Sequence, residues 1–330
     1  MELMKRLTER AQAAPKTVVY PEAAEDNILL AARAAADLGA ARPVLVGRAA
    51  DIEAAAARAG VALDGLDIVA PEGEQLEKYI GRYSARPGAL PAEAARFLLA
   101  QPLNFAAMMV SEGEADAMVA GYSHTTGEVI LAGQMIIGLE EGLATPSSLM
   151  LMNIPGWEGP EGPLLVFADC AIVPAPTAEE LADIAVSTAK TARELLQWEP
   201  RVALLSFSTH GSAEHERADL VLEALRLVRE RCPDLKADGE LQADAALIPS
   251  VAAKKTARPS PVAGRANVLI FPDLASANIG YKLVQRLAGA DAYGPLLQGF
   301  KKTVSDLSRG AAVEDIVGLT VMSVVRAGGS

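Results

Sequence analysis

The chain has 330 residues, half of them hydrophobic, and a formal net charge of -12. This length is large for a single hydrophobic core and suits two domains. The acidic balance, with no basic run longer than a Lys-Lys pair, argues against general nucleic-acid binding. Two cysteines and three histidines without metal-ligand spacing, no apolar leader and no apolar run of 18 residues predict a reduced cytoplasmic protein with neither a metal site nor a membrane span.

The first third of the chain alternates short apolar runs with Ala-rich helical periodicity. Strands are expected at residues 16–20, 42–47 and 115–121, and helices at 26–38 and 51–57. Between them, residues 76–111 form a mostly helical insert broken at Pro87 and Pro91. This alternation predicts a parallel sheet with right-handed crossovers, although no GxGxxG or P-loop fingerprint is present.

A polar loop, residues 121–127, follows the strand at 115–121. Its backbone N–H groups can bind an anion, with Thr125 and Thr126 as substrate-binding candidates. The alternative is ordinary turn chemistry in which one of these threonines caps the next helix. A lone loop histidine, His124, is more often a structural hydrogen-bonding group than a general base.

In the middle of the chain, residues 147–152 and 164–167 read as paired strands around a Gly/Pro-rich loop. Thr177 and Glu180 have the spacing of a capping box, which predicts a helix over 178–196. Cys170 follows a strand, but no His/Asp arrangement surrounds it, so a small buried hydrophobe is the preferred interpretation.

A strand at 201–207 leads into a Ser/Thr/Gly turn and then a helix that ends at Arg231. Ser208 and Thr209 either belong to a phosphate cradle, or the turn is an ordinary loop with Ser212 as helix cap. A further strand at 267–271 precedes a helix that Asn278 is expected to open. Lys282 on that helix either reaches a phosphate or is a solvated lysine.

The C-terminal stretch 304–316 joins a Gly-rich loop to an apolar helix. Ser308 and Asp315 are seven residues apart, so a helix that begins near Ser308 places both on one face, with Arg309 beside them. A hydroxyl donor, a cation and a carboxylate base suit attack on a phosphorylated acyl group. The alternative is a helix cap followed by a solvated acidic first turn.

Eight segments together resemble the phosphate acetyltransferase (phosphotransacetylase) family, and they occur in that family's order. They are residues 169–182 (DCAIVPAPTAEELA), 200–209 (PRVALLSFST), 238–242 (DGELQ), 260–264 (SPVAG), 271–274 (FPDL), 278–282 (NIGYK), 294–299 (GPLLQG) and 306–315 (DLSRGAAVED). The resemblance runs from about residue 116 to the end of the chain and is weaker before that.

The resemblance implies a two-domain parallel-sheet α/β fold with an interdomain cleft, like that of the isocitrate and isopropylmalate dehydrogenases. One domain would contain residues 1–143 and 299–330, the other 144–298, and the usual assembly is a homodimer. The implied partners are CoA, acetyl phosphate and phosphate, with coenzyme A as a substrate and no permanently bound cofactor. By motif, Asp315 is the general base toward the CoA thiol, and Arg309 and Ser308 stabilise the acyl phosphate during direct transfer.

The sequence departs from the family's pattern at two places. Leu131 and Ala132 occupy the positions of a family Arg-Pro pair whose arginine is implicated in phosphoryl binding. An upstream family arginine is matched only approximately by Arg86. Two alternatives therefore accompany acetyl transfer: a propionyl or butyryl transferase, and a homologue that binds CoA or acyl phosphate without turnover.

Overall fold

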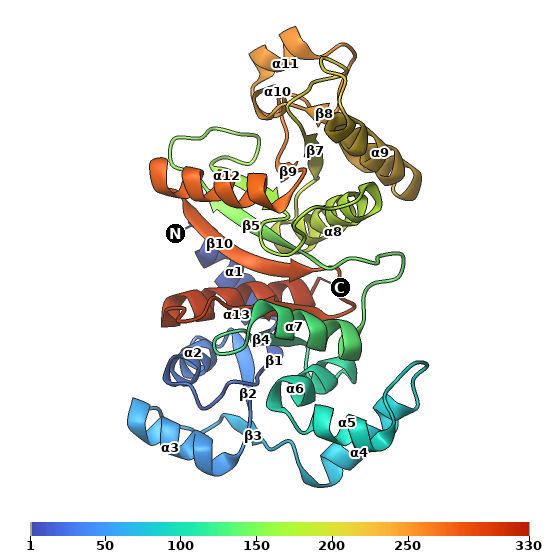
Figure 1. Ribbon diagram of the computed structural model, residues 1–330. Coiled ribbons are helices and arrows are strands. Elements are labelled where there is room, and N and C mark those ends of the chain that lie inside the picture. The colour runs from blue at the N-terminus through green and yellow to red at the C-terminus, as the bar shows by residue number, and fades with distance from the viewer. Residues whose placement is uncertain (1, 330) are drawn as a thin grey trace. The chain divides into compact units, whose positions relative to one another are not determined.

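The structure is a computed structural model that describes residues 2–329. The chain forms two compact units, one containing residues up to Glu140 and from Phe300 onward, the other Glu141–Gly299. Each unit is built on its own sheet with helices packed against it (Figure 1). The α/β fold class predicted from the sequence is confirmed.

The sheet of the first unit has five strands, which are all parallel, in the order β11-β4-β1-β2-β3. The strands are β1 (Lys16–Tyr20), β2 (Ala41–Val46), β3 (Asp67–Val69), β4 (Ala117–Ala120) and β11 (Thr303–Asp306). β4 is fully buried along its length, as expected for a strand covered on both faces. The sequence predicted β1, β2 and β4 but not β3 or β11.

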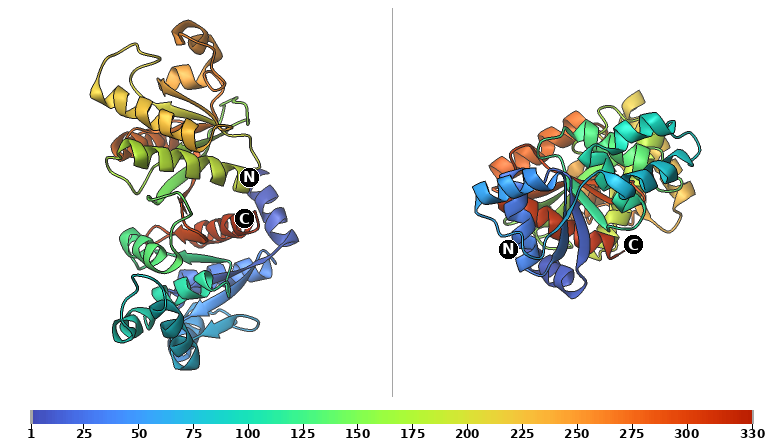
Figure 2. Two further views of the ribbon diagram at one scale, coloured as in Figure 1. Left: turned by 90° about the vertical axis from the view of Figure 1, so that its right-hand side faces the viewer. Right: turned by 90° about the horizontal axis from the view of Figure 1, so that it is seen from below.

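The helices of the first unit are α1 (Glu2–Ala13), α2 (Asp26–Asp37), α3 (Ala49–Ala59), α4 (Gly73–Ser84), α5 (Ala92–Leu99), α6 (Pro102–Ser111), α7 (Thr126–Ala132), the π-helical turn η1 (Gly133–Ile137) and α13 (Val313–Ala327). α13 packs against α1, α2 and the strands β1, β2, β4 and β11, whereas α6 contacts β1, β2 and β4. Figure 2 shows α13, in red, next to the dark-blue α1. Within the helical insert, α4 ends before Pro87 and α5 begins after Pro91, because neither proline fits a helix interior.

The second unit has a mixed six-stranded sheet in the order β10-β5-β6-β9-β7-β8. Its strands are β5 (Ser147–Asn153), β6 (Leu164–Ala168), β7 (Arg201–Leu205), β8 (Lys236–Leu241), β9 (Val268–Ile270) and β10 (Asp291–Gln298). β10, β5 and β6 pair antiparallel and the rest pair parallel. The predicted pairing of residues 147–152 with 164–167 is therefore confirmed.

The helices of the second unit are α8 (Ala178–Leu196), α9 (Glu216–Arg231), α10 (Ala243–Leu247), α11 (Pro249–Lys255) and α12 (Leu274–Leu287). The predicted capping box of α8 is present: Glu180 N donates to Thr177 Oγ1 at 3.2 Å, and Thr177 N donates to the Glu180 carboxylate at 2.8 Å. Because both ends of this signal lie within four residues, the sequence alone located the start of the helix.

Two predicted helix starts in the second unit are wrong. α9 begins at Glu216 with His215 as its cap, not Ser212, because His215 Nδ1 accepts the N–H of Arg217 at 3.1 Å. α12 begins at Leu274, where the Asp273 carboxylate accepts the N–H of Ser276 at 2.8 Å. Asn278 therefore lies in the second turn of α12 and does not open the helix. Among residues 2–329, no helix is both long and apolar enough to cross a bilayer.

Candidate active site

The carboxyl ends of β1, β4 and β11 lie next to one another, because these strands are parallel neighbours in the first unit. In parallel α/β sheets this edge is where ligands bind. The three following loops carry Glu22, residues 121–126, and the pair Ser308 and Arg309. The sheet thus assembles candidate residues from three distant parts of the chain.

The loop after β4 is folded around the carboxylate of Glu22. The backbone N–H groups of Tyr122, Ser123 and His124 donate to this carboxylate at 2.9, 2.8 and 2.8 Å. Ser123 Oγ adds a hydrogen bond at 3.2 Å. The sequence suggested that these N–H groups bind an external anion. In the structure they bind the carboxylate of Glu22 instead, and that interpretation is therefore corrected.

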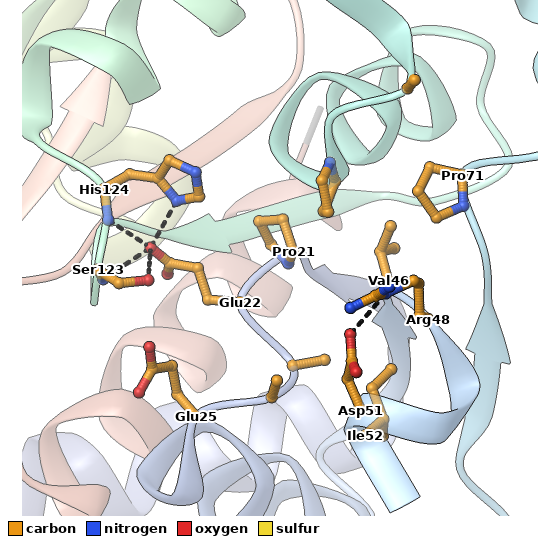
Figure 3. A pocket seen from close by; sticks show the side chains of 15 residues that line it. Pro21, Glu22, Glu25, Val46, Arg48, Asp51, Ile52, Pro71, Ser123 and His124 are labelled. Carbon is orange, nitrogen blue, oxygen red and sulfur yellow. Dashed lines mark hydrogen bonds and ion pairs between the residues drawn. The ribbon is translucent and has the colours of Figure 1, made fainter. Parts of the chain in front are cut away.

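His124 completes the environment of Glu22, with its Nδ1 2.8 Å from the carboxylate (Figure 3). The Glu22 side chain is 1% exposed, and burial by itself favours the neutral form of its carboxyl group. The hydrogen bonds from His124, Ser123 and Tyr122 outweigh burial, so the pKa of Glu22 is lowered. The same hydrogen bond raises the pKa of His124. His124 is therefore a structural partner of a buried carboxylate in this structure.

A second buried carboxylate, Asp306 at the end of β11, holds the other end of the same loop. Thr126 Oγ1 donates to Asp306 Oδ2 at 2.5 Å, while Oδ1 is buried without a hydrogen-bond partner among residues 2–329. Burial first, and then the charge of Glu22, raise the pKa of Asp306 to about 6. Gly121 permits this approach, because its φ is +101° and a Cβ there would lie 2.2 Å from Asp306 Oδ1.

Thr125 and Thr126 thus both have partners within the first unit. Thr125 caps α7 through a capping box with Glu128, whose N–H it accepts at 3.3 Å and to whose carboxylate it donates at 2.8 Å. The geometry corresponds to the helix-cap alternative. A role for either hydroxyl in binding substrate stays a prediction, and it requires the hydroxyl to exchange its present partner.

Ser308, Arg309 and Asp315 do not share one helix, so this part of the sequence-based argument is wrong. Ala311 N donates to Ser308 O at 3.0 Å to close a turn, Gly310 has φ of +73°, and α13 begins only at Val313. A left-handed residue cannot continue a helix, so the seven-residue spacing places no two of these side chains on one helical face. All three side chains are exposed, with Ser308 and Arg309 directly after β11 and Asp315 in the first turn of α13.

A cavity of about 380 Å³ lies at the same sheet edge, on the side of β1 and β2 (Figure 3). Pro21, Val46, Ile52 and Pro102 give it apolar walls, and Glu22, Ser123 and His124 form part of its lining. Arg48 at this cavity is 79% exposed and paired with Asp51 at 2.7 Å. The proposed catalytic residues Ser308, Arg309 and Asp315 are not among its lining residues.

In the second unit, the loop that contains Ser208 and Thr209 is closed on itself. The Ser208 hydroxyl donates to the buried Glu240 carboxylate at 2.7 Å, and the Thr209 hydroxyl donates to Gln242 Oε1 at 3.2 Å. The backbone N–H groups of residues 208–213 donate, in chain order, to Ser206 Oγ, Ser212 Oγ, the Glu240 carbonyl, the Glu240 carboxylate, the Thr209 carbonyl and Ser208 Oγ. A phosphate cradle made of free N–H groups is therefore not formed here.

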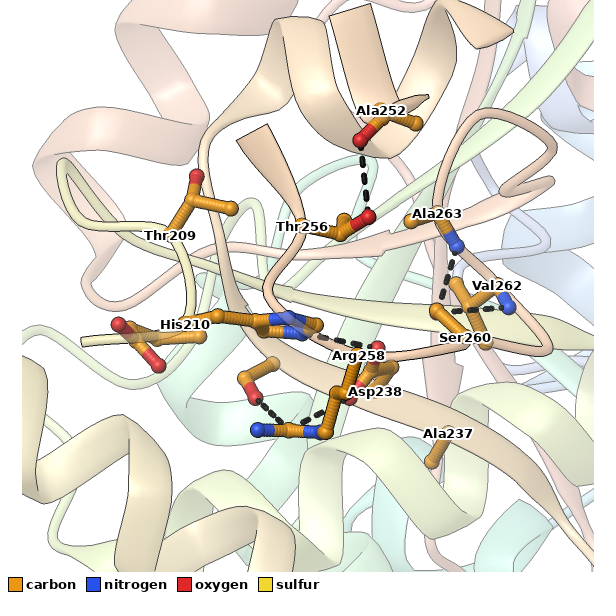
Figure 4. Close-up of polar contacts among 12 residues, drawn as sticks. Thr209, His210, Ala237, Asp238, Ala252, Thr256, Arg258, Ser260, Val262 and Ala263 are labelled. Atoms are coloured by element: carbon orange, nitrogen blue, oxygen red, sulfur yellow. Dashed lines mark hydrogen bonds and ion pairs between the residues drawn. The ribbon is translucent and has the colours of Figure 1, made fainter. Parts of the chain in front are cut away.

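A charged cluster fastens this loop to β8, as Figure 4 shows. His210 Nε2 is 3.1 Å from Asp238 Oδ2, and both side chains are 1% exposed. Arg229 and Arg258 each donate to Asp238 Oδ1 at 3.2 Å. Burial opposes ionisation of Asp238, but hydrogen bonds to its carboxylate and the nearby His210 and Arg258 still lower its pKa. His210, with φ of +47°, is a structural residue of the turn.

The remaining predicted binding residues also have local partners. Asn278 donates to the carbonyl of Cys170 at 3.3 Å, and the exposed Lys282 lies 5.0 Å from the ring of Tyr281. Arg86 donates to the Ile136 carbonyl at 2.5 Å and to Glu112 at 3.0 Å. Arg86 therefore ties the end of α4 to α6 and η1, and substrate binding by these residues stays a prediction.

Cys170 is buried, and burial together with the nearby Asp169 charge raises the pKa of its thiol. A buried thiol held neutral is a poor nucleophile, in agreement with the preferred interpretation of the sequence. Within residues 2–329, no group of three or more His, Cys, Asp or Glu side chains is placed to hold a metal ion.

Sequence reasoning missed the importance of Glu22 and Asp306. Glu22 lies two residues after the end of β1, and Asp306 is the last residue of β11. The signal that the sequence offered was therefore a single acidic residue at the end of a short apolar strand. It is a weak signal, because most acidic residues at such places are solvated caps.

Comparison with known proteins identifies the family. The profile of the phosphate acetyl/butaryl transferases matches residues 2–324. A phosphate acetyltransferase from Treponema pallidum is 46% identical over 338 aligned residues that cover all of both chains. The crystal structure of a phosphotransacetylase from Streptococcus pyogenes has a TM-score of 0.93 and 38% identity, and the match covers 100% of this chain and 99% of that one.

A dehydrogenase shares the architecture at much lower identity. The 4-hydroxythreonine-4-phosphate dehydrogenase of Burkholderia phymatum has a TM-score of 0.53 at 15% identity over 96% of this chain and 98% of that one, which concerns the fold alone. The dehydrogenase-like fold implied by the sequence motifs is thus confirmed. The full-length family match and the 46% identity together show that the chain belongs to the phosphate acetyl/butaryl transferase family of acyl-transferring enzymes.

Proposed function

We propose that this protein is a phosphate acetyltransferase, which interconverts acetyl-CoA and phosphate with acetyl phosphate and CoA. The observation that carries the proposal is the full-length likeness to a protein named for this activity. The exposed Ser308 and Arg309 beside the loop 121–126 at a sheet edge add support from the geometry. Small-molecule substrates and a cytoplasmic homodimer complete the proposal, and light scattering of the purified protein tests the assembly.

In the proposed reaction, the CoA thiol attacks the carbonyl carbon of acetyl phosphate while both substrates are bound. Asp315 takes the thiol proton, because a thiol with a pKa of about 8.5 is mostly protonated at neutral pH. A carbon–sulfur bond forms, the bond from the carbonyl carbon to the phosphate oxygen breaks, and phosphate leaves with the electron pair.

Arg309 and Ser308 have the stabilising roles in this proposal. The Arg309 guanidinium offers paired N–H donors that match a phosphate group, and Ser308 donates to the carbonyl oxygen as negative charge develops there. Their exposure supports access to dissolved substrates. The direct transfer needs no enzyme thiol, which fits the buried Cys170.

The test is acetyl-CoA formation from CoA and acetyl phosphate by wild type, Arg309→Ala, Asp315→Asn and Arg96→Ala. One preorganised donor contributes about 3 to 4 kcal/mol to transition-state stabilisation, so Arg309→Ala is expected to lose at least about 100-fold in kcat. Arg96→Ala is the matched control, since this exposed arginine on α5 pairs with Glu77 and does not line the cavity at the sheet edge. Turnover of Arg309→Ala within a few-fold of wild type removes Arg309 from the mechanism, and an inert wild type favours the non-catalytic binding homologue.

A propionyl or butyryl transferase is the second candidate, and Leu131 favours it. This leucine is 55% exposed on α7, at the place of the family arginine. Comparing kcat/KM for acetyl, propionyl and butyryl phosphate decides between the two, because one methylene in a pocket gives about 10- to 200-fold discrimination.

A further inference from the structure

The nest formed by residues 122–124 has the geometry of an anion-binding site, but its ligand is internal. Three successive N–H groups, one hydroxyl and one imidazole converge on the Glu22 carboxylate at 2.8 to 3.2 Å. In other proteins such nests of backbone N–H groups hold phosphate or other external anions. Here the acceptor comes from the turn after β1, about 100 residues away in the chain.

We propose that Glu22 is a positioning residue for acyl transfer: its carboxylate fills the nest and thereby fixes the loop that presents Thr125 and Thr126 to the acyl phosphate. This inference rests on the proposed function. Glu22 does not touch substrate in this proposal; it acts through the loop.

The loop is held at both of its ends, so the interaction of Glu22 with one end also affects where the two threonines lie. Glu22 fixes residues 122–124, and Asp306 fixes Thr126 through the 2.5 Å hydrogen bond. Thr125 lies between these two anchors. Loss of the first anchor leaves three N–H groups without their acceptor and lets Thr125 move with the loop.

The arrangement also connects the loop to the turn that carries Ser308 and Arg309. Asp306 is two residues before Ser308, and Leu307 N donates to Ala120 O at 2.7 Å just before the loop begins. A displaced loop is therefore expected to weaken the binding of acetyl phosphate more than the binding of CoA.

The experiment compares wild type, Glu22→Ala, Glu22→Gln and the control Glu25→Ala. Glu25 is half-buried, lies one turn further on and lines the same cavity, but its side chain is not in the nest. Steady-state assays with each substrate varied in turn, with and without added sodium formate, separate the KM for acetyl phosphate from the KM for CoA and from kcat. Thermal unfolding of each variant with and without formate follows in parallel.

For Glu22→Ala we expect the KM for acetyl phosphate to rise at least about 10-fold and the KM for CoA to stay within about twofold of wild type. Formate is a carboxylate small enough for the emptied nest. It is expected to increase the kcat/KM of Glu22→Ala at least about fivefold over its value without formate, and to raise the melting temperature of this variant alone. Glu22→Gln still fills the nest, so formate should have no effect on it, and Glu25→Ala should behave as wild type.

A loss confined to kcat in both Glu22 variants, with both KM values unchanged and no effect of formate, overturns the proposal because it indicates general damage to the fold. If Glu22→Ala folds neither without nor with formate, the expected refilling of the nest has failed, and the proposal is overturned equally. An inert wild type instead refutes the proposed function; formate stabilisation of Glu22→Ala then still decides whether the nest is an anion site.

Discussion

Asp306→Asn is expected to change how the free energy of unfolding depends on pH. Asp306 is 2% exposed, one of its carboxylate oxygens accepts from Thr126 and the other has no partner among residues 2–329. The pKa of this carboxyl is raised from 3.8 to about 6, first by burial and then by the charge of Glu22. The folded protein therefore keeps a proton that the unfolded chain has already released.

The sign and size follow from this difference. The stabilising effect of the neutral carboxyl is fully present below about pH 4 and is lost as the pH rises through about 6. Two pH units between the unfolded and folded pKa values correspond to about 3 kcal/mol as an upper limit. Asparagine has the same shape and stays neutral, so its stability does not fall over this range for this reason. Asp306→Asn should thus gain on wild type by up to about 3 kcal/mol between about pH 4 and pH 7.5.

Urea unfolding of wild type, Asp306→Asn and Asp67→Asn across about pH 4 to pH 8 measures the effect. Asp67 begins β3 in the same sheet and is exposed, so water already solvates its carboxylate and its variant should follow wild type. Glu22, whose pKa is shifted in the opposite direction, is present in all three proteins, so its contribution cancels to first order in the difference. A difference between Asp306→Asn and wild type that does not change with pH would refute the reasoning.

Three further outcomes are expected. Gly121→Ala should lower the free energy of unfolding by more than about 2 kcal/mol, because the added methyl group would lie 2.2 Å from Asp306 Oδ1. Gly65→Ala should lower it by only about 1 kcal/mol, because Gly65 has φ of +75° but no atom within 4 Å of the added methyl group. Urea unfolding of both variants separates the steric clash from the backbone strain. Cys170→Ala should keep kcat within about twofold, and a 100-fold loss would restore the thiol to the mechanism. Asp238→Asn should destabilise the protein by about 3 kcal/mol in urea unfolding, since it breaks a buried pair; an unchanged midpoint would show that the cluster contributes nothing.

Local signals explain how much of the fold the sequence could predict. β1, α2 and β2 each have a complete periodic pattern within a dozen residues, and the capping box of Thr177 located α8. β10 was missed because it is an antiparallel strand whose first residue is exposed and whose next four are half-buried, and because it contains Gly294 and Pro295, which are typical breakers. β11 has four residues and becomes a strand only by pairing with β4, which is a tertiary effect.

The sequence singled out the loop after β4 as a candidate anion site, but it did not predict the contacts of that loop. The loop after β4 was recognised from its composition, yet the acceptor of its N–H groups lies about 100 residues earlier, at Glu22. No local pattern contains that information, because the contact exists only once β1 and β4 are neighbours in the sheet. The helix start near Ser308 failed for a different reason: the signature residues read as a helix start, but Gly310 adopts a left-handed conformation before α13 begins.

The charges at this sheet edge determine what an anionic substrate needs from the protein. Glu22 already uses the donors of residues 122–124, and its charge also raises the pKa of Asp306, so both groups oppose a further anion nearby. Backbone donors of this loop cannot compensate a phosphoryl group, and the positive charge must come from a side chain. Arg309 is exposed directly beyond β11, always charged, and shaped for two parallel hydrogen bonds to a phosphate. Removal of its guanidinium leaves the phosphoryl group without this cation, which is the physical reason to expect a larger loss from Arg309→Ala than from truncating the threonine hydroxyls.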